Sequence, residues 1–261
     1  MDVASPRRHL QRARGRLCLL RVGAPHTQKN KLSPHLKQQW CIPPEQNAEF
    51  VWHMEDVLDV YTRPYDPRFP QVCFDERPVQ LCADVREPEP ARPGVPTRED
   101  YEYERRGTAN LFLWYEPLKG KRHIEATDDR RRPDWAHCIK DLVDVHYSDA
   151  EKIVLVLDNL NIHSPASLYT AFEPREAKRI ADKLEIHLTP KHGSWLNIAE
   201  IELAVLAGQC LNRRLSDIET MRQEIAAWER DRNAVSTGVN WRFTTADARI
   251  KLKRLYPSHQ P

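Results

Sequence analysis

Two aspartates each follow a short apolar run, and this arrangement is typical of a metal site. Residues 151–164, EKIVLVLDNLNIHS, contain five consecutive apolar residues and then Asp158. Asp75 follows a second apolar stretch, residues 72–74. An acid at the carboxyl end of a buried strand lies where open α/β sheets bind ligands, although many such aspartates only cap a turn. If the two strands are neighbours, the like charges require a cation, and carboxylate oxygens favour Mg²⁺ or Mn²⁺.

The elements around these aspartates predict an α/β domain over residues 71–215. The pattern reads β-β-β-α-β-α-β-α, which fits a mixed sheet with helices packed on it. The apolar run before Asp158 is unbroken, as expected for a central strand covered on both faces. The polar, proline-rich stretch 84–107 predicts a long loop. The expected strands are 71–85, 108–118, 121–129, 153–157 and 185–190, and the expected helices start at 134, 174 and 196, the last reaching 215.

Three further segments flank this domain. Residues 1–30 are arginine-rich and irregular, and a basic arm on DNA, a transit peptide and a disordered or truncated end all remain open. Residues 31–70 predict a linker with a helix over 43–60. Residues 216–261 predict a basic helical tail that starts with a capping box formed by Ser216 and Glu219.

Composition limits the class of protein. Hydrophobic residues make up 40% and charged residues 30% of the 261 residues, which predicts a globular protein with a polar surface. No apolar run approaches the ~20 residues of a membrane helix. The net charge of +2 leaves any attraction to nucleic acid to local patches. The six cysteines form no CxxC pair, which favours reduced thiols in the cytoplasm and argues against a structural zinc site.

Three sequence blocks, CFDERP, LVLDNLNIHS and TPKHGSWLNIAEIEL, together resemble the catalytic blocks of DDE transposases. The similarity is to the bacterial insertion-sequence branch of the mariner superfamily and spans about residues 31–261. It implies an RNase H-like fold with a five-stranded mixed sheet and two divalent ions, Mg²⁺ or Mn²⁺. The ligands implied by the resemblance are Asp75, Asp158 and Glu200. Helical spacing alone leaves Glu202 open as a rival to Glu200, because the two acids lie on opposite edges of one apolar stripe.

The resemblance implies metal-dependent cleavage of DNA at transposon ends and strand transfer into target DNA, by a homodimer on DNA in the cytoplasm or nucleoid. Family members carry a helix-turn-helix region before the catalytic part, whereas only about thirty unfamiliar residues precede the matching blocks here. We therefore expect a truncated copy. A non-catalytic remnant that interferes with an intact transposase and a general RNase H-like nuclease remain open as alternatives.

Other polar residues are candidates for DNA contact or for support of the acids. Asn159, Asn161, His163 and Asn197 are expected to support the acids, with turn-stabilising hydrogen bonds favoured over phosphate contact for His163. Glu76 alternates to the other strand face and is expected to be structural. Trp195 is expected to anchor a loop rather than to stack on a base. The expected phosphate contacts, with a solvated surface as the alternative, are Lys121, Arg122, Arg130, Arg131, Arg132, Lys191 and His192.

Overall fold

A computed structural model describes residues 45–258 of the chain. Five strands form one mixed sheet in the order β3-β2-β1-β4-β5. Strand β1 is parallel to β4 and antiparallel to β2, β3 is antiparallel to β2, and β5 is parallel to β4. The predicted mixed sheet is therefore confirmed, whereas the arginine-rich segment 1–30 lies outside the described residues. The strands are β1 Gln71–Asp84, β2 Tyr103–Glu116, β3 Lys121–Thr127, β4 Ile153–Leu157 and β5 Leu184–Leu188.

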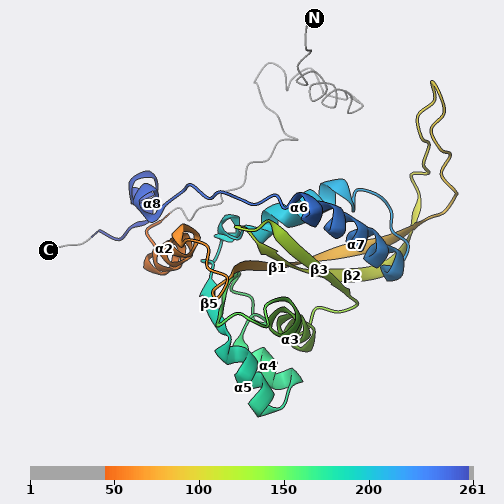
Figure 1. The fold of residues 1–261 in the computed structure, drawn as a ribbon. Helices are drawn as coiled ribbons and strands as arrows, with labels where there is room; N and C mark the ends of the chain where they lie inside the picture. Colours follow the sequence, from red (N-terminus) through yellow and green to blue (C-terminus); the bar gives the residue numbers. More distant parts are fainter. Residues whose placement is uncertain (1–44, 259–261) are drawn as a thin grey trace, which may run out of the picture. The chain divides into compact units, whose positions relative to one another are not determined.

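Helices cover both faces of the sheet (Figure 1). Strand β4 shows why: Ile153, Leu155 and Leu157 enter one core, and Val154 and Val156 enter the other. A strand buried on both faces needs an unbroken apolar run, which is the pattern read from the sequence. One core includes residues of α3 Arg132–Asp141, α4 Pro165–Ala171 and α5 Pro174–Asp182; the other includes residues of α2 Ala48–Thr62, α6 Ala199–Gln209, α7 Ile218–Val235 and α8 Thr245–Lys251.

Several boundaries differ from the sequence prediction. The long helix expected over 196–215 is a 3₁₀ turn, Ser194–Leu196, followed by the shorter α6. The helix expected from Ser216 is capped instead by Asp217, whose side chain accepts from the Thr220 amide, so the predicted capping box is wrong by one residue. Helix α4 was not predicted, because seven residues provide little helical periodicity.

The segment expected as a loop over residues 84–107 is partly a hairpin. Strand β2 already starts at Tyr103, and the isolated bridges Glu89–Arg98 and Arg92–Val95 continue the pairing toward the tip. Figure 1 shows this ribbon extending beyond the body of the sheet. Its side chains are mostly exposed, so its polar composition reflects solvent on both faces rather than irregular backbone.

Helix α7 covers the free edge of β3. The Asn233 side chain accepts from the Arg122 amide and donates to the Arg122 carbonyl, at 3.0 and 2.8 Å. Glu229 accepts from the Ile124 amide at 3.1 Å, and Arg222 donates to the Ala126 carbonyl at 3.0 Å. These side chains satisfy backbone groups that would otherwise offer a template for another strand.

Two negative findings concern residues 45–258. None of their helices is both long and apolar enough to cross a membrane. Their four cysteines, Cys73, Cys82, Cys138 and Cys210, are free thiols.

Candidate active site

The two aspartates lie on adjacent parallel strands. Residues Gln71, Val72 and Cys73 of β1 pair with Val154, Leu155 and Val156 of β4, so Asp75 and Asp158 occupy the next matching positions. Strand β1 continues past the end of β4, which leaves Asp158 on the loop at the carboxyl end of the strand pair. Asp75 is 9% exposed, and its Oδ1 accepts from the Glu76 amide at 2.8 Å. Strand alternation turns Asp75 toward the face that α6 covers, whereas the Asp158 carboxylate lies beside His163, with its Oδ1 2.5 Å from the ring Nδ1.

Glu200 approaches the same edge from the first turn of α6. The buried Asn197 ties this turn to the sheet, because its Nδ2 donates to the Phe74 carbonyl at 2.9 Å. Its Oδ1 accepts from the Ala199 amide at 3.1 Å, in place of a conventional helix cap. The start of α6 is thus fixed to the residue directly before Asp75.

The pKa of Asp75 reflects its burial and the charges of the neighbouring acids. Burial raises the pKa of Asp75 from 3.8 to about 7, the Glu76 amide opposes this, and the charges of Glu76, Asp158 and Glu200 raise it further. A carboxyl group with this pKa is poorly stabilised as an anion unless a cation lies beside it. The three acids therefore fit a hard divalent ion, and Mg²⁺ sites commonly use only one or two such carboxylates.

His163 lies behind the aspartates and contacts two acids. Its Nε2 is 2.9 Å from Oε2 of Glu76 and its Nδ1 is 2.5 Å from Oδ1 of Asp158, with the ring fully buried. Burial lowers the pKa of His163, but the two carboxylates outweigh it and raise the pKa to about 9. The ring thus links Glu76 to Asp158, and its raised pKa favours the charged form beside these two acids. Glu76 faces away from Asp75, as strand alternation predicted.

Glu76, Asp158 and His163 also lie close enough to share a metal ion, because each residue offers one ligand atom and these atoms lie within 4.8 Å of one another. Metal binding through His163 requires the neutral ring, and both ring nitrogens lie beside carboxylates. Arg130 also lies 3.3 Å from Glu76. We therefore treat His163 and Arg130 as partners of Glu76, and the ligands that the resemblance implies stay Asp75, Asp158 and Glu200.

A cleft of about 400 Å³ opens beside Asp158. Its walls include Asn159 from the loop after β4 and Thr189, Lys191 and His192 from the loop after β5. Lys191 and His192 are exposed, and the backbone of His192 is left-handed, with φ of 65°. The structure thus places these two predicted phosphate contacts in the cleft beside Asp158. Asn161 is exposed on the same loop as Asn159.

The basic segment near β3 divides into groups with different surroundings. Arg130, Arg131 and Arg132 are exposed at the end that leads into α3. Lys121 is exposed at the opposite end of β3 and lies over the rings of Trp114 and Tyr147. All four are exposed, although Arg130 pairs with Glu76 and Arg131 with Asp129, and their contact with phosphate stays a prediction.

Arg122 does not belong to this group, and its assignment as a phosphate contact is withdrawn. Its side chain is 0% exposed, its Nε lies 3.1 Å from Glu202, and its Nη2 donates to the Thr237 carbonyl at 3.2 Å. Alternation within the edge strand turns Arg122 inward while Lys121 points outward. A run of basic letters does not reveal this difference.

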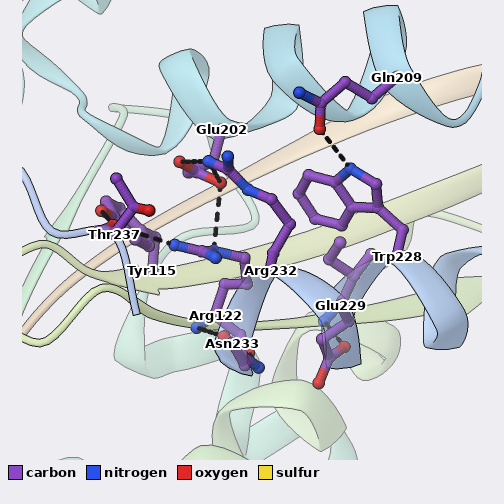
Figure 2. Close-up of polar contacts among 10 residues, drawn as sticks. Tyr115, Arg122, Glu202, Gln209, Trp228, Glu229, Arg232, Asn233 and Thr237 are labelled. Atoms are coloured by element: carbon purple, nitrogen blue, oxygen red, sulfur yellow. Dashed lines mark hydrogen bonds and ion pairs between the residues drawn. The ribbon is translucent and has the colours of Figure 1, made fainter. Parts of the chain in front are cut away.

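Glu202, the rival third acid, takes part in the same buried cluster. Figure 2 shows its carboxylate between Arg122 and Arg232. Arg232 belongs to helix α7, and its Nη2 lies 2.8 Å from Oε1 of Glu202. Two guanidinium groups already neutralise this carboxylate, so it has no charge left for a metal. The choice that helical spacing left open therefore favours Glu200.

Comparison with known proteins supplies the family. The model of the family described as "DDE superfamily endonuclease" matches residues 70–222, which is more than half of the chain. The chain belongs to this DDE endonuclease family. The matched range contains all three candidate acids. No curated protein matches the chain.

Two solved structures show the same fold. The chain is similar to the Mos1 mariner paired-end complex with Mn, with a TM-score of 0.50 and 14% identity over 77% of this chain. It is similar to the Mos1 transposase paired-end complex with left transposon end, with a TM-score of 0.51 and 14% identity over 78% of this chain. The chain spans 61% of the length of each of these proteins. The five-stranded sheet of this DDE endonuclease is therefore RNase H-like, as the sequence blocks implied.

Proposed function

We propose that this chain is a transposase catalytic domain that cleaves DNA at transposon ends and joins the freed end to target DNA. Asp75, Asp158 and Glu200 would hold two Mg²⁺ or Mn²⁺ ions. The observation that supports this best is that Asp75 and Asp158 occupy matching positions on the paired parallel strands β1 and β4, while Asn197 ties the start of α6, which carries Glu200, to Phe74 of β1. A site with this excess of negative charge is suited to cations and, through them, to the phosphates of DNA.

The bound ions would supply an activated water and stabilise the leaving oxygen of a phosphodiester. The side chains of this chain hold the ligands still. Asp75 is fixed by the Glu76 amide, Asp158 by His163, and Glu200 by the Asn197 clamp on β1. Rigid ligands matter because a displacement of about 1 Å in such a site can reduce the rate about a hundredfold.

The cleft beside Asp158 would take the DNA strand. Lys191 and His192 line it, and Arg130 contacts Glu76, the residue after Asp75. Such cations contact phosphate oxygens and position the backbone without reading the base sequence. The two Mos1 structures are paired-end complexes, one with Mn and one with a left transposon end, which supports transposon-end DNA and a divalent ion as partners of this chain. A homodimer on DNA is part of the proposal.

Cleavage of a terminal-repeat duplex tests the proposal. The wild-type chain should cut in Mg²⁺ or Mn²⁺ and not in excess chelator, and Asp75→Asn, Asp158→Asn and Glu200→Gln should each abolish cutting. Glu219→Gln, an exposed acid on α7, is the matched control and should cut normally. Products joined to target DNA indicate a transposase, whereas products that are only cut indicate a general nuclease. Unchanged cutting by the Asp75 variant would overturn the site.

A further inference from the structure

Two segments outside the matched range 70–222 meet at the loop that leads to Glu200. One is helix α2, and the other is the C-terminal strap, which we define as residues 236–258. The strap leaves α7, passes the turn between β2 and β3, where the Val239 amide donates to the Pro117 carbonyl at 2.8 Å, and ends on α2. Its last contacts include the Leu255 carbonyl, which accepts from the Asn47 amide at 3.0 Å.

Tyr61 of α2 makes the central contact. Its side chain is buried, and its hydroxyl donates to the Leu196 carbonyl at 2.6 Å. The same hydroxyl lies 3.4 Å from the sulfur of Cys73, two residues before Asp75 on the same strand face. One hydroxyl therefore joins the strand that carries the first acid to the loop that delivers the third.

The strap holds both sides of this contact. The Trp241 ring packs on the Tyr61 ring, with centroids 5.0 Å apart. The Trp241 Nε1 donates to the Phe243 carbonyl at 2.6 Å, and the Phe243 ring meets Trp195 edge-on at 6.2 Å. Trp195 directly precedes Leu196, so the aromatic groups of the strap restrain the same loop that Tyr61 bonds.

Leu196 is one turn ahead of Glu200 along the chain. Asn197 follows it, and the Glu200 amide donates to the Asn197 carbonyl at 3.1 Å. A shift of the Leu196 carbonyl therefore moves the turn from which Glu200 projects. A site built this way depends on supporting contacts that lock the ligand in place.

We propose that Tyr61, held by Trp241 of the strap, is a positioning residue that sets Glu200 against Asp75 and Asp158. The catalytic site would then need α2 and the strap as well as the matched domain. This inference rests on the proposed function, because it assigns Glu200 to the metal site. It adds a residue that acts through the backbone of Leu196 and touches neither metal nor DNA.

Tyr61→Phe is a sharp test because it removes one hydroxyl and keeps the ring on which Trp241 packs. Tyr256→Phe is the matched control: its hydroxyl also bonds α2, through Glu55 at 2.7 Å, and within residues 45–258 it forms no hydrogen bond to the Leu196 loop. Three quantities would be measured on the full chain: amide hydrogen exchange at Asn197, Glu200 and Ile201 without metal, Mn²⁺ affinity, and affinity for duplex DNA.

Tyr61→Phe should speed exchange at these amides and weaken Mn²⁺ binding, each by about fivefold to tenfold, the effect of one neutral hydrogen bond. Its affinity for DNA should stay unchanged, and Tyr256→Phe should match the wild type in all three. If Tyr61→Phe has the same amide exchange rates and the same Mn²⁺ affinity as the wild type, the inference is overturned, even if the variant unfolds more easily. If the wild-type chain binds no Mn²⁺, the proposed function fails, and the exchange comparison alone decides the role of Tyr61.

Discussion

Asp75→Asn should stabilise the metal-free protein, and this outcome follows from the raised pKa of Asp75. Burial is the main cause of the raised pKa, and repulsion from Glu76, Asp158 and Glu200 adds to it. The pKa rises from 3.8 to about 7. Each pH unit corresponds to about 1.4 kcal/mol, so the ionised carboxylate disfavours the fold by about 4 kcal/mol when no cation is bound. Asparagine keeps the volume of the side chain and removes its charge.

The pH dependence has a definite sign. Between about pH 4 and pH 7 the folded chain holds a proton on Asp75 that the unfolded chain has released. The free energy of unfolding of the wild type should therefore fall through this window as the pH rises. Asp75→Asn should lack this part of the fall, because asparagine does not titrate. The advantage of the variant should be near zero at about pH 4 and should level off above about pH 7.

Urea unfolding in excess chelator, at several values between these limits, measures the difference directly. Adding Mg²⁺ at the high end should then stabilise the wild type and leave Asp75→Asn unaffected, because ligand binding stabilises only a chain that keeps its site. Parallel stability curves for the two proteins across the pH range would refute the reasoning, since they would mean that Asp75 is not a strained, buried acid.

Three further predictions follow from other parts of the structure. Glu202→Gln should lower the free energy of unfolding by about 3–5 kcal/mol, because it leaves the buried Arg122 uncompensated, whereas Glu200→Gln should remove metal binding without such a loss. Titration calorimetry measures the metal binding and denaturant unfolding measures the stability, and the reverse ranking would show that the acids are misassigned. Lys191→Ala should weaken duplex binding and reduce the slope of log affinity against log salt by about one. Lys178→Ala is the control, because Lys178 pairs with Asp182 on α5, and a Lys191→Ala slope equal to that of the wild type would place DNA elsewhere. Combined replacement of Glu229 and Asn233 by alanine should expose the β3 edge and produce oligomers detectable by light scattering, and a strictly monodisperse variant would show that α7 does not protect this edge.

Much of the catalytic frame can be predicted from local sequence. An unbroken apolar run identifies a strand buried on both faces, and the residue after it falls at the sheet edge whatever the rest of the fold does. This logic places Asp158, and the parallel pairing of β1 with β4 confirms that Asp75 lies beside it. Alternation along a strand also predicts that Glu76 turns away from Asp75, since successive side chains point to opposite faces. Periods of two residues are properties of the backbone and need no knowledge of distant partners.

Helix boundaries were harder to predict because their stops depend on single contacts. The helix expected over 196–215 is interrupted near Asn197, whose side chain bonds the Phe74 carbonyl from a distant strand. The polarity of residues 84–107 predicts a loop, because polar stretches usually have irregular backbone. Part of this stretch nevertheless pairs as a ribbon that is exposed on both faces. In both cases the deciding partner lies far away in sequence.

The sequence by itself determined which residue types are available at the sheet edge: two strand-borne aspartates and two acids on one helix. Only the tertiary structure shows how the surroundings of those two acids differ, because the guanidinium groups that neutralise Glu202 come from β3 and α7. It also turned Arg122 from a surface cation into a buried one, and it brought Tyr61 and Trp241 to the loop before Glu200. Charge pairing and burial depend on which elements meet in space, and local periodicity contains no information about that meeting.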